Sequence, residues 1–195
     1  MPETKNRTIE LTDPRALRAV AHPVRLELIG LLRRRGPMTA TQAAARIGES
    51  PASCSFHLRQ LAKYGLVEEA GGGRGRERPW RATASLTSWA PAGDEDHEEA
   101  TGMLARVVVE RYFEQTLEWL DRRRSEPQEW AEVSEVGDRV LYATPAELAE
   151  LDQRLGELLD PFIERLEDPS SRPDGARAVN LIRLVFPLPD EPAEE

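Results

Sequence analysis

The sequence predicts a mainly α-helical chain with a small amount of β-structure. Several segments repeat apolar residues at helical spacing and lie between a capping residue and a Gly or Pro. A Gly-rich stretch, residues 71–76, separates two short segments with strand character. A long amphipathic segment, residues 94–124, precedes two strand-like segments that flank another helix, which predicts a small α/β unit at the C-terminal end.

Composition sets the broad class of protein. The 195 residues suffice for one domain and a smaller second one, and 39% hydrophobic with 31% charged residues can bury a core in water. No apolar run approaches the roughly 18 residues of a membrane span, and the chain does not open with a signal-peptide core. The single cysteine, Cys54, excludes an internal disulfide and fits a reducing compartment. We therefore expect a cytoplasmic protein that does not contact membranes.

Charge is unevenly distributed along the chain, whose net charge is -9. Residues 1–21 hold 4 Lys/Arg and 3 Asp/Glu, a net charge of +1. Residues 22–82 hold 11 and 5, which is +6, whereas residues 83–195 hold 11 and 27, which is -16. A basic block joined to an acidic block is typical of a polyanion-binding surface attached to a part that does not touch the polyanion.

The chain is expected to begin with a short strand and two helices. Residues 9–11 are the candidate strand, and Asp13 can cap a helix that starts at Pro14. Pro23 interrupts this helix, because proline disfavours helical geometry in the residue before it. A second helix then follows over residues 23–35.

The next two helices are separated by a tight turn. Thr39 or Thr41 caps the first of them, which Gly48 closes. Only Gly48 and Glu49 separate it from Ser50, where the following helix begins. A helix, a tight Gly-containing turn and a second helix form a helix-turn-helix arrangement.

The second helix of this pair, residues 50–64, has clear ends and two different faces. Ser50 is a good N-cap, Pro51 suits the first helical position, and Gly65 follows the last turn. The buried face is expected to hold Cys54, Leu58 and Leu61, at the spacing i, i+4, i+7. The outward face carries Ser53, Ser55, Phe56, Arg59, Gln60 and Lys63, without a carboxylate.

This outward face suits a nucleic acid. Arginine and glutamine can form paired hydrogen bonds to base edges, while serine and lysine can hold phosphate. An ordinary surface helix would also have a polar outer face, and only its neighbours in the chain distinguish the two interpretations.

A β-wing is expected directly after this helix. Residues 66–70 and 78–83 read as two strands joined by the Gly-rich tip. Three arginines, Arg74, Arg76 and Arg78, can lie along a phosphate backbone or enter a minor groove. A mobile solvated loop with incidental arginines is the alternative, but a wing placed directly after a helix-turn-helix favours DNA binding.

Residues 12–83 resemble the winged helix-turn-helix domain of ArsR-type bacterial repressors, through HPVRLELIGLL (22–32), ATQAAARIGESPASCSFHLRQLAKYGLVEEA (40–70) and RPWRAT (78–83). The resemblance implies a homodimer that binds double-stranded DNA and represses transcription until an effector releases it. It also implies that the second helix enters the major groove through Ser53, Ser55, His57, Arg59, Gln60 and Lys63. For His57, a hydrogen bond within the fold is an equally good interpretation.

The sequence departs from metal-sensing members of that family, which carry paired cysteines on this helix or His/Asp clusters on terminal helices. Here Cys54 stands alone on the apolar face, where a thiol often acts as a small apolar group. Residues 94–99, DEDHEE, can be a metal cluster or a helix start; we favour the helix start, because carboxylates are stabilised there. We therefore expect no metal site and no cofactor.

The second half begins with an expected linker, residues 84–93, and a long helix over residues 94–124. The apolar band of this helix is wide enough to cover its own domain and to pair with a second copy. Burial wholly within one chain is the alternative. The band comprises Met103, Leu104, Val107, Val108, Tyr112, Phe113, Leu117 and Leu120.

A strand at residues 139–142, a helix from Thr144 to about Glu167 and a strand at residues 178–186 are expected next, before an acidic tail at residues 190–195. The inward side of this helix should hold Leu148, Leu151, Leu155, Leu158, Leu159, Phe162 and Leu166. Four aromatic residues fit either an effector pocket or plain core, and we favour core: Trp119, Trp130, Tyr142 and Phe162.

Together these features predict a dimeric DNA-binding transcription regulator, and the family resemblance favours a repressor. Its DNA-binding domain would span residues 12–83, and a dimerisation domain that can also hold a small-molecule effector would span residues 94–189. A winged helix used only for protein contacts is the alternative, and would bind no duplex at low salt. An enzyme is not expected, because we find no Ser/His/Asp or Cys/His constellation and no Gly-rich phosphate loop that opens a helix.

Overall fold

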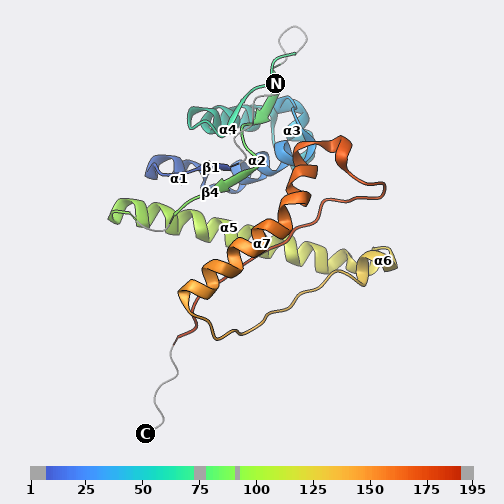
Figure 1. The fold of residues 1–195 in the computed structure, drawn as a ribbon. Coiled ribbons are helices and arrows are strands. Elements are labelled where there is room, and N and C mark those ends of the chain that lie inside the picture. The colour runs from blue at the N-terminus through green and yellow to red at the C-terminus, as the bar shows by residue number, and fades with distance from the viewer. Residues whose placement is uncertain (1–7, 73–77, 91–92, 190–195) are drawn as a thin grey trace.

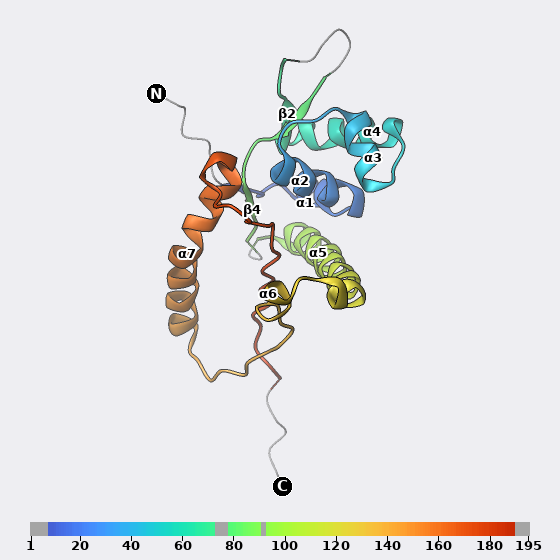
Figure 2. The ribbon, with the colours of Figure 1, turned by 90° about the vertical axis from the view of Figure 1, so that its right-hand side faces the viewer.

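A computed structural model describes residues 8–72, 78–90 and 93–189 of the chain. Helices account for 58% and strands for 7% of the structure, which confirms the mainly helical class. Figure 1 shows the short N-terminal helices stacked above the long helix α5 (Glu95–Arg122). In Figure 2, α7 (Pro145–Glu167) stands to one side of α5.

The first two helices, α1 (Pro14–Val20) and α2 (Pro23–Arg35), meet at a break imposed by proline. The Asp13 carboxylate caps α1 by accepting a hydrogen bond from the backbone N–H of Arg15 at 2.8 Å. His22 has an extended backbone, with φ -152° and ψ 127°, and α2 starts at the next residue. Both helices and the break between them are confirmed.

Helix α3 (Ala40–Ile47) starts and ends with the capping chemistry that the sequence predicts. Thr39 is the cap, in a capping box with Gln42, so each side chain satisfies a backbone N–H of the other residue. Gly48 follows in the left-handed region, with φ 73°, which glycine adopts without steric cost. The turn into the next helix is therefore tight.

Helix α4 (Pro51–Lys63) completes the predicted helix-turn-helix. Ser50 Oγ accepts a hydrogen bond from the N–H of Ser53 at 3.1 Å and caps the helix. Gly65, with φ 72°, turns the chain away after the last residues. The predicted apolar face is buried completely: Cys54, Leu58 and Leu61 are each 0% exposed.

The wing is a small antiparallel sheet. Strands β2 (Val67–Glu69) and β3 (Trp80–Ala82) pair with Val67 opposite Ala82. Met38 adds a bridge on the other edge of β3, through two backbone hydrogen bonds with Trp80 of 3.0 and 2.8 Å. The base of the predicted wing is confirmed, and its tip at residues 73–77 lies outside the described part of the chain.

Part of the stretch that was expected to be a linker forms a strand. Strand β4 (Leu86–Ser88) runs parallel to β1 (Thr8–Glu10). The side chain of Arg33 ties this stretch to α2, because it donates to the Ala84 carbonyl at 2.9 Å and to Thr87 Oγ1 at 2.6 Å. Burial lowers the pKa of Arg33 to about 10.

One hydrophobic core joins the winged part to the start of α5. It contains Leu17, Leu28, Leu58, Leu61, Leu66, Ala100 and Leu104 among its most buried members. Beyond Leu104, no described residue is buried. The core therefore ends within the first turns of α5, and a short 3₁₀-helix (Arg123–Ser125) and α6 (Gln128–Ala131) follow without adding to it.

The C-terminal unit differs from the prediction in its strands. Residues 139–142 and 178–186 have the sequence of strands, yet neither segment forms one in the single chain. A strand requires a hydrogen-bonded partner, and among the described residues neither segment has a backbone partner. Thr144 caps α7 in a capping box with Glu147, as predicted.

The side chains of this unit also differ from the prediction. The face of α7 that was expected to be inward is only partly covered: Leu148, Leu155, Leu159 and Leu166 are half-buried, whereas Leu151, Leu158 and Phe162 are exposed. None of the four aromatic residues is core: Trp119 and Trp130 are half-buried, Tyr142 and Phe162 exposed. The part of the chain that the structure describes contains no helix both long and apolar enough to cross a membrane.

Replacing Leu61 tests how much the core stabilises α4. Leu61→Ala should lower the free energy of unfolding by about 2–5 kcal/mol, because it removes a completely buried side chain and leaves a cavity. Chemical denaturation of the full chain measures this change. Phe56→Ala, on the same helix but 49% exposed, is the control and should cost much less. Equal losses in the two variants would contradict this packing.

Candidate nucleic-acid interface

Five of the six predicted contact residues of α4 lie on the side that the core leaves free. Arg59 and Lys63 are exposed, while Ser53, Ser55 and Gln60 are half-buried. The opposite side of α4 packs against α1, α2, α3 and β2. Figure 1 shows α4 near the upper end of the molecule, with α5 below it, so its free face is directed away from the acidic half.

The guanidinium of Arg59 is already oriented on this face. Its Nη1 donates a hydrogen bond to Ser55 Oγ at 2.9 Å, one helical turn earlier. A long side chain held in one position loses less conformational entropy when a partner binds. Arg59 is therefore prepared for a contact in which geometry matters.

Phe56 belongs to the same face and was not among the predicted contacts. It is 49% exposed and packs the edge of its ring against His57, with ring centroids 5.2 Å apart. The sequence did contain a signal, because a large apolar residue at an outward helical position calls for an explanation. An exposed aromatic ring between polar groups can make apolar contact with a base.

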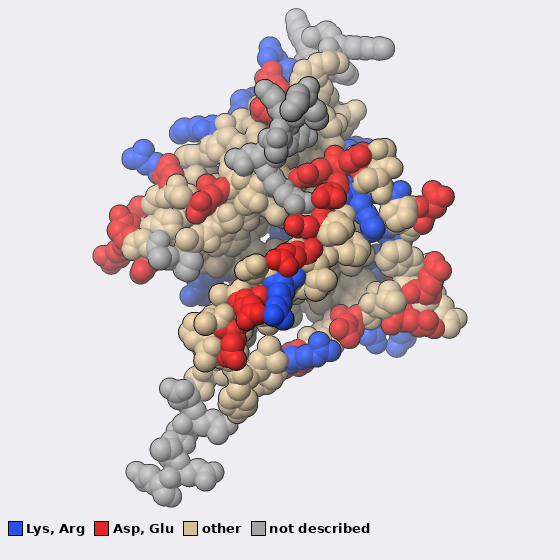
Figure 3. All heavy atoms as spheres, in the orientation of Figure 1, with Lys and Arg blue, Asp and Glu red and all other residues tan. Residues whose placement is uncertain are grey.

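The electrostatics of this face favour an anion. Helix α4 contains no Asp or Glu between Pro51 and Lys63. Figure 3 shows Lys and Arg side chains along the edge that carries α4, whereas Asp and Glu gather along α7 and at the start of α5. On the side of the molecule that Figure 3 shows, the basic groups near α4 and the acidic groups of α7 thus lie apart.

The position of His57 differs from that of the other predicted contacts. It is only 8% exposed and packs against His22 in a tilted arrangement, with ring centroids 4.6 Å apart. The Nδ1 atoms of both rings are buried and have no hydrogen-bond partner within the described residues. His57 lies three residues after Cys54, at the edge of the buried stripe, and this places it under α4 instead of on its open face.

Protonation of this histidine pair is disfavoured. Burial, followed by the charge of Arg25, lowers the pKa of His22. Burial, followed by the proximity of His22 and Arg25, lowers the pKa of His57, and Glu49 opposes both shifts. Arg25 itself donates to the Ala19 carbonyl, so it stays beside the pair.

Cys54 is a packing residue in this structure. Its side chain is completely buried, and burial raises the pKa of the thiol, which keeps it neutral. A neutral thiol among leucines behaves as a small apolar group. No group of three or more His, Cys, Asp or Glu residues that could hold a metal ion occurs in the described ranges.

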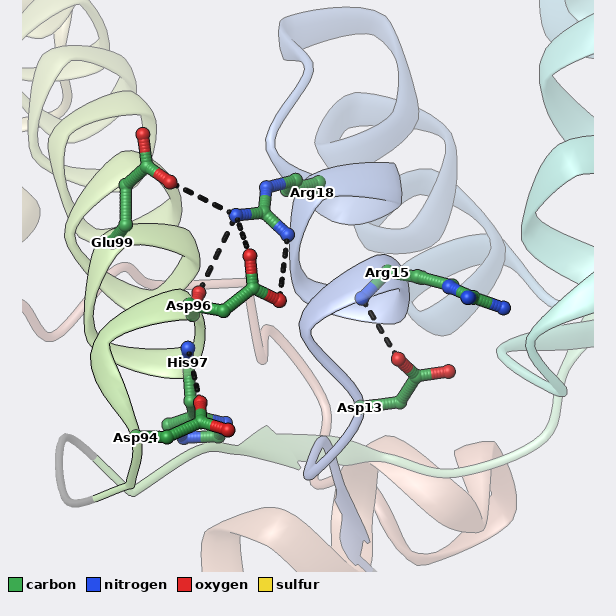
Figure 4. A network of polar contacts seen from close by, with 7 residues as sticks. All are labelled: Asp13, Arg15, Arg18, Asp94, Asp96, His97 and Glu99. Atoms are coloured by element: carbon green, nitrogen blue, oxygen red, sulfur yellow. Dashed lines mark hydrogen bonds and ion pairs between the residues drawn. The ribbon is translucent and has the colours of Figure 1, made fainter.

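The acidic run at residues 94–99 starts α5, which confirms the helix-start interpretation. Asp94 Oδ1 accepts a hydrogen bond from the N–H of His97 at 2.9 Å and caps the helix. Asp96 and Glu99 bind the guanidinium of Arg18 on α1, at 2.6 and 3.0 Å, as Figure 4 shows. These carboxylates therefore hold α5 against the DNA-binding part.

A second ion pair connects α5 to α2. Arg111 Nη2 lies 2.6 Å from Glu27 Oε2, and Arg34 binds the other carboxylate oxygen at 3.2 Å. Burial opposes ionisation of Glu27, but its hydrogen bonds and the charges of both arginines leave its pKa lowered. The two arginines therefore keep Glu27 charged and fix α5 across α2.

The arginines of the wing are not all available. Arg78 Nη1 lies 2.9 Å from Glu69 Oε2, which neutralises much of its charge, and Arg81 pairs with Glu68 at 2.7 Å. Arg74 and Arg76, the two predicted contacts at the wing tip, lie outside the described residues. Of the three wing arginines that were predicted to contact the DNA backbone, only Arg78 therefore lies among the described residues, and it already pairs with a carboxylate.

Comparison with known proteins identifies the class of this domain. A family model described as a helix-turn-helix domain matches residues 20–70, from the end of α1 through β2. The match supports a winged helix-turn-helix regulator, and with it DNA binding and transcription regulation. No curated protein matches the chain.

The histidine pair makes the stability of this domain depend on pH. Because the pKa of His57 is lowered in the folded chain, the unfolded chain takes up a proton at this residue more readily than the folded chain does. The contribution of His57 to the free energy of unfolding is therefore full above the unfolded pKa of about 6.5 and is lost as the pH falls below that value. We expect the free energy of unfolding to fall more steeply between pH 6.5 and pH 5 in the natural chain than in His57→Gln, as measured by denaturation at each pH. Thr41→Ala, at an exposed position of α3, keeps the histidine pair and should retain the steep slope. Identical slopes in the natural chain and His57→Gln would contradict the assignment.

Proposed function

We propose that this chain is a dimeric winged helix-turn-helix repressor that reads double-stranded DNA with α4. The observation that carries the proposal is the free face of α4, which is open, lacks carboxylates and presents an oriented guanidinium. A polar outer face alone would fit any surface helix. A face that excludes negative charge in a chain of net charge -9 calls for a more specific explanation.

Each side chain of this face has a role that its chemistry fits. Arg59 and Gln60 would donate hydrogen bonds to base edges in the major groove, and Phe56 would contact a thymine methyl group. Ser53, Ser55 and Lys63 would bind phosphate and fix the position of the helix. We assign His57 to the packing beneath α4, because it is buried.

The wing would bind the backbone next to the groove that α4 occupies. Arg74 and Arg76 are the arginines that we assign to phosphate, or to a narrow minor groove. We give Arg78 a smaller share, because the Glu69 carboxylate beside it offsets part of its charge and repels phosphate.

Two copies are needed for selectivity, because one module spans too few base pairs. We assign dimerisation to residues 94–189, where the side chains beyond Leu104 remain unburied in the single chain. A small-molecule effector that shifts α5 would act on α4 through the contacts of α5 with Arg18 and Glu27. Such a shift would change the distance between the two α4 helices.

Removing single side chains of α4 tests base reading. With a duplex selected from a random pool, Arg59→Ala and Gln60→Ala should each lose roughly 1–3 kcal/mol of discrimination between the selected and an unrelated sequence. Titrations of both duplexes with each variant, followed by gel shift, measure this difference. Arg154→Ala removes an exposed arginine from α7 and is the matched control, which should change neither affinity. Unchanged discrimination in both α4 variants would contradict base reading.

The wing should act on all sequences alike. Arg74→Ala is expected to weaken binding to selected and unrelated duplexes equally and to reduce the slope of log K against log salt by about 0.9, for one lost phosphate contact. Arg78→Ala should change the slope less, because Glu69 already neutralises it. Binding measured at several salt concentrations provides both slopes. A larger effect for Arg78 than for Arg74 would contradict these roles.

A protein-interaction module remains the competing function, and the ion pairs of Arg78 and Arg81 on the wing favour it. It predicts that the chain binds no duplex even at low salt. Selection from a random pool at low salt therefore separates the two functions, since enrichment of a common sequence supports DNA reading and a failure to bind any duplex supports the module.

A further inference from the structure

The described part of the chain beyond Leu104 has secondary structure but no core of its own. Of the large apolar side chains that are exposed in the described residues, only Phe56 and Leu86 lie before residue 100. The others lie on α5, on α7 and in the extended segments, with Leu158 at 69% and Val185 at 72%. Most of the stability of a helix in a protein comes from packing its apolar face, so α7 requires a surface that one chain does not supply.

The segment at residues 178–186, AVNLIRLVF, has an apolar sequence and a fixed position. Asn180 Nδ2 donates to Gln115 Oε1 on α5 at 2.7 Å, and Arg183 pairs with Asp152 on α7 at 2.6 Å. These two contacts hold the segment beside both helices. Figure 2 shows this segment running between the two helices.

The backbone N–H and C=O groups of residues 178–186 are unpaired within the described part of the chain. An apolar strand with unpaired N–H and C=O groups is a template for pairing with another strand. A run that is apolar on both sides is also typical of a strand that becomes buried on both faces.

We propose that residues 178–186 of two copies of this chain pair as antiparallel strands, and that α7 and the exposed face of α5 pack around this pair. An antiparallel pair of identical strands is self-complementary about a two-fold axis, so one kind of chain supplies both strands and each strand pairs one of its edges. The exposed side chains of α5, among them Phe113 and Leu117, lie on the side of the helix opposite to Leu104, which is buried in the core. Helix α5 would thus pack one side against its own chain and present the other side to the dimer.

This inference rests on the proposed function only for the two-fold symmetry that a paired DNA site requires. The strand pair differs from pairing through α5 alone, because it makes residues 178–186 essential to the dimer. A dimer that does not depend on this segment would overturn the inference and leave the proposed function intact. Absence of DNA binding would overturn the proposed function and leave the strand pair intact.

Light scattering after gel filtration of the full chain, without DNA, tests the strand pair. The natural chain should show twice the 21.9 kDa of one copy. Leu184→Lys places a charge in the strand pair and should raise the dimer dissociation constant roughly tenfold or more. Leu86→Lys, the same change at an exposed leucine of the winged part, should leave the mass unchanged. A monomeric natural chain, or a Leu184→Lys dimer of unchanged affinity, would overturn the proposal.

Cysteine cross-linking tests the pairing itself, even where Leu184→Lys impairs folding. Because Cys54 is the only cysteine, Cys54→Ala allows single cysteines to be placed at each position from 179 to 186. Identical antiparallel strands bring one residue next to its own copy, within the Cα separation of about 4.4–6.8 Å that a disulfide needs. Intermolecular disulfides should therefore peak at one or two neighbouring positions, and a cysteine at position 86 should form none. Absence of a disulfide at every position of the segment would refute the strand pair.

Discussion

The burial of one face of α4 is the constraint on which the rest of the structure depends. Cys54, Leu58 and Leu61 are completely buried, and a helix that buries three residues on one side cannot rotate about its axis. The outward direction of Arg59 and Lys63 is a geometric consequence of that burial. The site is therefore as rigid as the core beneath it, although its own side chains are exposed.

The same core links the DNA-binding part to the acidic half of the chain. Ala100 and Leu104 of α5 belong to it, and the ion pairs of Arg18 with Asp96 and of Glu27 with Arg111 hold α5 against α1 and α2. Displacing α5 would break these contacts together, because they lie on one rigid helix. This is a physical route by which events in residues 94–189 can reach α4, and it does not require α4 itself to change shape.

Local chemistry explains why the first half could be predicted and the last part could not. Capping residues, Pro23, Gly48 and the 3.6-residue spacing of apolar groups determine α1 to α4 within the chain, and the structure reproduces each of them. The strand β4 was missed because its pairing with β1 joins segments far apart in sequence.

The strands expected at residues 139–142 and 178–186 did not form for a different reason. Their sequences favour strands, but a strand exists only with a partner, and one copy of the chain provides none within its described residues. On α4, spacing alone predicted that Arg59 and Lys63 are exposed, whereas His57 lies at the edge of the apolar stripe, where spacing does not decide between burial and exposure. The pairing of Arg78 with Glu69 depends on strand register, which sequence indicates only approximately.

The central claim is that the free face of α4 lies in the major groove of DNA. Dimethyl sulfate protection tests it directly, because guanine N7 lies in the major groove and adenine N3 in the minor groove. With the full chain bound to a duplex selected from a random pool, we predict protection of guanine N7 in two clusters about one helical turn, roughly 34 Å, apart. Protection confined to adenine N3, or no protection at saturating concentrations of the chain, would contradict the claim.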